Sequence, residues 1–208
     1  MNHKTTILAL TVLLSACSMT SEAGKTEHAI TNKEKKTMSN TEINPKLTPK
    51  ELLTKLLTLL KKAESVDDFT PQRLEQVFGV PIVTDEEDSS SYGFGERVTK
   101  DWNYSFSVNT NPLLRNKQFL LSFDWQGDKS IAHPEMTAVC GMKFDEFVEK
   151  AEAIGFSAKP IYVKGNIFRG GDLSNGRLRI QIRTAAEHDW DERGQGKACI
   201  ESMRVYSI

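Results

Sequence analysis

Alternation of apolar and polar residues between positions 102 and 125 constrains the fold of this chain more than any other feature. In the stretch DWNYSFSVN, every second residue is apolar, and the stretch QFLLSFDW repeats the pattern after a turn-rich segment. The apolar positions are Trp102, Tyr104, Phe106, Val108, Phe119, Leu121, Phe123 and Trp125. A period of two is typical of strands that bury one face and expose the other. We therefore predict an antiparallel hairpin in a sheet with one covered face, and SYGFGERV predicts a short strand before it.

Two amphipathic helices are predicted ahead of this hairpin. In LTPKELLTKLLTLLKKAES, Thr48 is a suitable N-cap, Pro49 fits the first helical position and Glu51 completes a capping box. Its leucines recur at helical spacing and are expected to pack in the core. In FTPQRLEQVFGVP, Thr70 repeats the cap and Gly79 is a typical helix stop.

The second half of the chain repeats the order of helix and strands. The stretch KFDEFVEKAEAIGF predicts a helix, and KPIYVKGNIFRG, GRLRIQIRT and ACIESMRVYSI predict strands. Asn175-Gly176 marks a turn between the first two of these strands. In the next strand, alternate residues face the core, and Arg177, Arg179, Gln181 and Arg183 face the other way. The fold class is thus α+β, helices packed on an antiparallel sheet, and the repeated order suggests two helix-plus-sheet repeats at 45–127 and 141–208.

The start of the chain has the features of an export signal. A short basic region with His3 and Lys4 precedes eight apolar residues at 7–14, too few to span a bilayer. Leu-Ser-Ala-Cys, ending at Cys17, resembles the lipobox of bacterial lipoprotein signal peptides. The resemblance implies cleavage after residue 16, lipidation of Cys17 and, because Ser18 follows, anchoring in the outer membrane. An ordinary secretory signal with an incidental cysteine is the alternative.

Residues 17–44 differ from the rest in composition. Apart from the lipidation site, they lack aromatic residues and a periodic apolar face, and their lysines and glutamates balance. Such a segment cannot bury enough surface to fold. We expect a flexible tether to a periplasmic domain at 45–208, which holds 22 basic and 24 acidic residues. That near-neutral balance predicts no nucleic-acid partner, so membrane contact is expected through the lipid anchor alone.

The element order of 45–208 resembles that of the β-lactamase-inhibitor-protein family and of small outer-membrane assembly lipoproteins. The likeness is one of order and carries no residue motif, so it implies no binding residues.

No enzymatic motif is found in the sequence. Gly-x-Ser-x-Gly, Cys-x-x-Cys and His-Glu-x-x-His are all absent, and neither a catalytic residue nor a cofactor is predicted. Glu187–Glu192 includes His188, Asp189 and Asp191, but one histidine without a spaced partner favours a solvated acidic loop over a metal site. Once Cys17 is lipidated, Cys140 and Cys199 are the remaining thiols, and an oxidising compartment favours a disulfide between them. Two separate buried thiols are the alternative.

The long connection Ala185–Lys197 is the predicted partner-binding surface. Trp190 is flanked by charged residues, and an exposed tryptophan near Arg193 is a common composition at interfaces. His188 and Asp191 belong to the same predicted surface; the alternative is that Trp190 caps the sheet. We therefore expect a non-catalytic protein-binding lipoprotein, with an inhibitor, immunity or envelope-assembly role. An envelope hydrolase with an unrecognised active site is the alternative.

Overall fold

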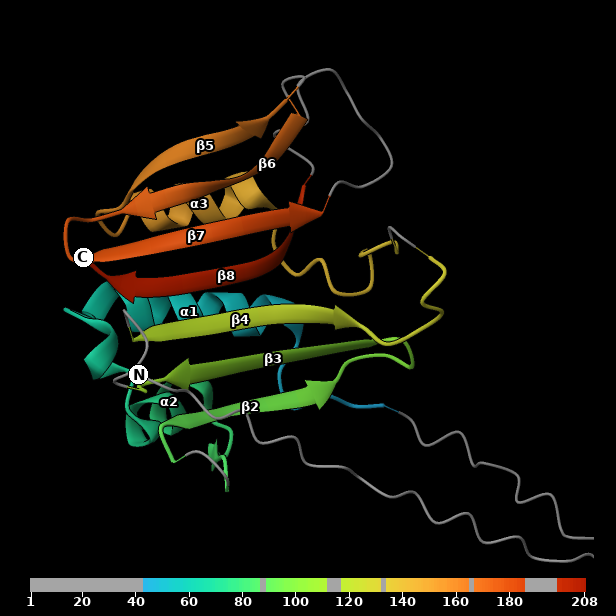
Figure 1. Ribbon diagram of the computed structural model, residues 1–208, viewed down its shortest axis with the longest axis horizontal. Coiled ribbons are helices and arrows are strands. Elements are labelled where there is room, and N and C mark those ends of the chain that lie inside the picture. Colours follow the sequence, from blue (N-terminus) through green and yellow to red (C-terminus); the bar gives the residue numbers. More distant parts are fainter. Residues whose placement is uncertain (1–42, 87–88, 112–116, 132–133, 165–166, 186–197) are drawn as a thin grey trace, which may run out of the picture. The chain divides into compact units, whose positions relative to one another are not determined.

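Strands from both halves of the chain join edge to edge in one antiparallel sheet (Figure 1). The computed structural model describes residues 43–86, 89–111, 117–131, 134–164, 167–185 and 198–208. Within them, the strand order is β1-β2-β3-β4-β8-β7-β6-β5. The strands are β1 Val83–Thr84, β2 Ser91–Arg97, β3 Trp102–Asn109, β4 Gln118–Trp125, β5 Ser157–Val163, β6 Ile167–Ser174, β7 Leu178–Ala185 and β8 Cys199–Ser207. The helices are α1 Pro49–Lys62, the 3₁₀ turn η1 Val66–Asp68, α2 Pro71–Phe78 and α3 Phe144–Glu152.

Helices α1 and α2 begin where their caps predict. The Thr48 hydroxyl accepts a hydrogen bond from the Glu51 amide at 3.2 Å, and the Glu51 carboxylate accepts one from the Thr48 amide at 2.8 Å. This reciprocal pair satisfies two amides that have no partner within the helix. Helix α2 is capped by Thr70 and ends at Gly79, which adopts the left-handed conformation with φ 71°.

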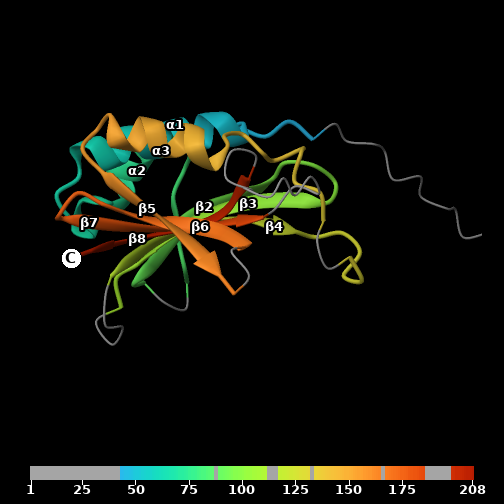
Figure 2. The same cartoon turned by 90° about the horizontal axis from the view of Figure 1, so that it is seen from above.

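All three α-helices lie on one side of the sheet (Figure 2). Their buried side chains and those of the strands form a single hydrophobic cluster. Phe78 of α2 stacks on Phe106 of β3 with ring centroids 4.4 Å apart, and Phe144 of α3 meets Phe168 of β6 edge-on at 4.9 Å. Every second side chain of β3 enters this cluster. The predicted alternation, with one covered face, is confirmed.

The predicted disulfide is confirmed. Cys140 and Cys199 are bonded, with their Cα atoms 5.3 Å apart. Cys140 lies before α3, and Cys199 opens β8 and is fully buried. The bridge therefore fastens the segment that leads into α3 to the strand in the middle of the sheet, because β8 pairs with β4 on one side and β7 on the other.

Several details differ from the sequence-based expectation. The mixed α+β class is correct, but the two repeats are not supported, since α1, η1 and α2 precede the first strands whereas α3 alone precedes the later ones. Residues 159–170, predicted as one strand, belong to the two strands β5 and β6. The Gly165-Asn166 pair between them is itself a turn signal, which explains the break. Strand β1 and the turn η1 were not predicted.

Candidate functional site

The face of the sheet opposite the helices is the candidate functional site, and we refer to it as the open face (Figure 2). Residues that pair directly across antiparallel strands point to the same face. Gln181 of β7 pairs with Arg204 of β8, and Arg204 pairs with Leu120 of β4. These side chains are partly or fully exposed, whereas Ile180 and Ile182, their neighbours in β7, are buried. The described helices leave this second surface of the sheet uncovered.

The two halves of the open face differ in chemistry. On β2 and β3, the open-face side is mostly glycine, serine and asparagine. On β5 to β8, the charged groups of this face are those that the register places there, Lys159, Asp172, Arg179, Arg183 and Arg204, and two that line the hollow described below, Arg169 and Glu201. The second set holds five cations and two anions, so this half is electropositive although the whole chain carries a formal net charge of −1.

A hollow of about 600 Å³ lies in the charged half of the open face. Arg169, Arg183 and Arg204 contribute to its wall, and Leu120 and Ile161 provide apolar surface. All three arginines are exposed. We call this site the arginine hollow; it combines cationic groups with apolar contact area.

Two β-bulges shape the arginine hollow. Ile161 pairs with Gly170 but Tyr162 pairs with Phe168, which leaves Arg169 as an extra residue in β6. Glu201 is the extra residue in β8, because Arg183 pairs with Ser202 and Thr184 with Ile200. Bulges bend a strand, increase its twist and redirect a side chain. Both extra residues line the hollow.

Glycine is required beside the first bulge. Gly170 has φ +124°, and a Cβ atom at this position would lie 2.0 Å from the carbonyl oxygen of Ile182. Its backbone thus approaches β7 more closely than any side chain permits. This close approach fixes the position of β6, the strand that carries Arg169, against β7.

A shallower trough of about 420 Å³ lies over β2 and β3. Its floor includes Gly93 and Gly95 of β2 and Ser105 and Ser107 of β3. A Cβ atom at Gly93 would lie 2.1 Å from the carbonyl oxygen of Phe106. The trough therefore exposes backbone and small side chains, which leaves room for larger side chains of a binding partner.

Some charged groups of the open face are already paired. Arg179 donates a hydrogen bond to Asp172, and this bond and the attraction between the charges raise the pKa of Arg179. Asp124, beside the arginine hollow, accepts a hydrogen bond from Ser122 Oγ at 3.0 Å. By contrast, no ion pair or side-chain hydrogen bond within the described part of the chain engages Arg169, Arg183 or Arg204.

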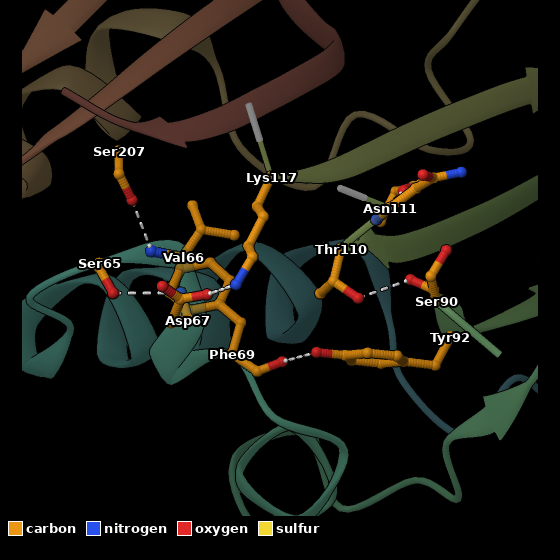
Figure 3. A network of polar contacts seen from close by, with 11 residues as sticks. Ser65, Val66, Asp67, Phe69, Ser90, Tyr92, Thr110, Asn111, Lys117 and Ser207 are labelled. Atoms are coloured by element: carbon orange, nitrogen blue, oxygen red, sulfur yellow. Dashed lines mark hydrogen bonds and ion pairs between the residues drawn. The ribbon is translucent and has the colours of Figure 1, made fainter. Parts of the chain in front are cut away.

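A polar network at one end of the sheet fixes the turn η1 (Figure 3). The Val66 amide donates to Ser207 Oγ at 2.9 Å, and Lys117 Nζ lies 2.5 Å from Asp67 Oδ1. Tyr92 Oη donates to the Phe69 carbonyl at 3.0 Å, and burial raises the pKa of the Tyr92 phenol. These bonds join η1, and Phe69 directly after it, to residues of β2 and β8 and to the residue before β4. The network therefore has a structural role.

A second polar group holds the start of the domain. Glu96 of β2 accepts hydrogen bonds from Tyr104 Oη and, at 3.2 Å, from the Leu47 amide. Burial, followed by the hydrogen bond to Glu96, raises the pKa of Tyr104. The phenol therefore stays protonated at neutral pH and serves as a hydrogen-bond donor.

The structure brings together one predicted pair, Cys140 and Cys199, and leaves the other predicted residues untested. Cys17 and the predicted partner-binding residues His188, Trp190, Asp191 and Arg193 lie outside the described residues, as does the acidic stretch 187–192. Sequence reasoning assigned Arg179, Gln181 and Arg183 correctly to the side away from the core. It missed Arg169 and Arg204, because bulges shift the alternation in β6 and β8.

Comparisons with family models, curated proteins and solved structures give no match for this chain. Among the described residues, no helix combines the length and hydrophobicity needed to cross a membrane. The same residues contain no group of three or more histidine, cysteine, aspartate or glutamate side chains placed to bind a metal. The functional assignment thus depends on the open face itself.

Proposed function

We propose that this chain is a bacterial lipoprotein, anchored through Cys17, whose domain binds another envelope protein through the open face. The lipobox-like sequence at Leu14–Cys17 and the tether predicted at 17–44 support the anchoring. The observation that carries the binding role is the uncovered sheet surface, which offers an arginine hollow beside a glycine- and serine-lined trough.

The dimensions of the open face suit a protein partner. From β2 to β6 the sheet contains six neighbouring strands, and the five spacings between them, at about 4.8 Å each, give a width of roughly 24 Å. Strands of eight residues, such as β3 and β7, are roughly 26 Å long. A surface of this size is comparable to the roughly 800 Å² that each partner buries in a typical protein–protein interface.

Two positions offer a matched test of this surface. Ser107 of β3 lines the trough on the open face, and Thr58 of α1 is an exposed residue on the helix-covered side. A photo-crosslinking amino acid at each position, in the lipidated protein in its own cells, should give a discrete adduct from position 107 only. Equal adducts from both positions, or none from position 107, would contradict the proposal.

Anchoring has its own test. Cys17→Ser removes the thiol that would carry the lipid, and we expect the protein to move from the membrane fraction to the soluble periplasmic fraction. Each buried methylene of an acyl chain contributes about 0.8 kcal/mol to membrane binding, so loss of several chains abolishes stable attachment. Unchanged membrane association of the serine variant would refute lipidation at this residue.

The predicted contribution of Trp190 remains to be tested. Residues 186–197 connect β7 to β8, the strands that carry Arg183 and Arg204. We expect Trp190→Ala to weaken partner binding by about thirtyfold, equivalent to roughly 2 kcal/mol, with little change in melting temperature. Lower stability with normal binding would instead favour the role of a cap on the sheet.

A further inference from the structure

We infer that the arginine hollow binds carboxylate side chains of an acidic segment of the partner protein. This inference rests on the proposed function, since it identifies the chemistry that the open face recognises. The hollow is formed by β4, in the middle of the sheet, and by β8, β7, β6 and β5, which follow it in the strand order. It holds three guanidinium groups beside apolar surface.

The arginines form a diagonal row across neighbouring strands. Gly170, next to Arg169, pairs with Arg183 of β7. Arg204 of β8 pairs with Gln181, two residues before Arg183 in β7. Diagonal neighbours of this kind are about 7–8 Å apart at their Cα atoms, within reach of long side chains. Several carboxylates on one peptide segment can therefore meet the row together.

These arginines differ from three other cations of the domain, which already form ion pairs. Arg177 pairs with Glu64, Arg179 with Asp172 and Lys117 with Asp67. Arg169, Arg183 and Arg204 have no such partner among the described residues, and their side chains are exposed. A guanidinium group binds a carboxylate through two parallel hydrogen bonds, which gives both affinity and defined geometry. The row therefore presents unused capacity for carboxylates.

The other residues that line the hollow favour a peptide over a simple anion or a polyanion. Leu120 and Ile161 can cover apolar side chains that flank the acidic ones, which a simple anion lacks. Asp124 and Glu201 also line the hollow, so its net charge is too small to favour a densely charged polymer such as polyphosphate. Asp124 already accepts a hydrogen bond from Ser122, whereas Glu201 is exposed and would repel an incoming carboxylate.

A direct test measures binding of a fluorescent ten-residue peptide of alternating glutamate and leucine to the full-length mature protein in detergent. We expect the variant R169Q/R183Q/R204Q to bind at least about tenfold more weakly, and Glu201→Gln to bind about two- to threefold more tightly. The control variant K50Q/K61Q/K62Q removes three exposed charges from α1, on the other side of the sheet, and should stay within about twofold of wild type. A peptide of alternating lysine and leucine should not bind.

Three results would overturn the inference. They are unchanged peptide binding by R169Q/R183Q/R204Q, an equal loss in the α1 control, and tighter binding of polyphosphate than of the glutamate peptide. Because the arginines are exposed, their replacement should leave the melting temperature unchanged. Crosslinking from position 107 distinguishes failure of this inference from failure of the proposed function. A normal adduct in the arginine variant refutes the role of the arginine hollow and leaves the proposed function intact. Loss of the adduct in that variant supports both.

Discussion

The two faces of strand β7 follow different rules. Leu178, Ile180 and Ile182 are buried under the helices, at no more than 2% exposure. Arg179, Gln181 and Arg183 alternate with them and face the open side. The first set must be apolar for the sheet to hold its helices. The second set does not pack in the core. Arg179 is paired with Asp172, whereas Arg183 has no ion-pair partner among the described residues and is available for binding.

The same contrast runs across the whole sheet. On β3, Phe106 is 1% exposed and stacks on Phe78, while its neighbour Ser107 lines an open trough. Packing fixes residues on the covered face, whereas close backbone approach and bulges shape the open face. Substitutions on the two faces should therefore separate stability from binding, and the following predictions begin with the largest expected change in stability.

Truncation on the covered face should be the most damaging. Phe106→Ala removes a ring that contacts Phe78 and Phe119, with centroids 4.4 Å and 5.8 Å away. Large-to-small changes of this kind cost about 3–5 kcal/mol. Urea unfolding should show this loss, and Ser107→Ala in the same strand should stay within about 0.5 kcal/mol of wild type. Similar losses from both substitutions would contradict the distinction between the faces.

Removal of the disulfide should destabilise the covered face without altering the open one. The bridge spans a sequence separation of 59 residues. The chain-entropy model gives about 4 kcal/mol for a loop of this length. We expect the variant C140A/C199A to unfold at lower urea concentration yet retain binding of the glutamate peptide while folded. Thiol titration of the unfolded, unreduced wild-type protein should find neither cysteine reactive; two reactive thiols would refute the bridge.

Gly170→Ala should reduce both stability and peptide binding. The new Cβ atom would meet the Ile182 carbonyl oxygen at 2.0 Å, and φ is +124°. Unfavourable backbone conformations of this kind cost about 1–3 kcal/mol before the close contact is counted. Gly176→Ala is a matched control, since Gly176 also has positive φ but no atom lies within 4 Å of its added Cβ. A smaller loss at Gly170 than at Gly176 would show that the close approach is unimportant.

A smaller, pH-dependent effect is expected at the turn η1. The Glu64 amide donates to Asp68 at 2.7 Å, and this bond, supported by one from the Ser65 amide, lowers the pKa of Asp68 below its ordinary value of 3.8. Its stabilising contribution is therefore complete above that value and lost as the pH falls through the lower pKa of the folded state. We expect Asp68→Asn to cost about 0.5 kcal/mol at pH 7, given solvent screening, and less near pH 2. An equal difference at both pH values would contradict this assignment.

Sequence patterns predicted the covered face better than the open one. Caps at Thr48 and Thr70, and the alternation in β3 and β4, indicate local structure directly, because propensity and burial agree there. The disulfide followed from the number of thiols and the expected compartment. The arginine hollow could not be predicted, since it depends on bulges in β6 and β8 and on the pairing of β4 with β8. These long-range features leave no periodic signal in the sequence.

The central claim is that the open face, and not the helix-covered side, binds a partner protein. The most direct measurement compares partner affinity for Ser107→Trp on the trough and Thr58→Trp on α1, using the protein identified by crosslinking. A bulky ring on the open face should weaken binding at least about tenfold, while the same ring on α1 should leave it unchanged. Both variants should melt at the wild-type temperature. Weaker binding by Thr58→Trp, with normal binding by Ser107→Trp, would contradict the account.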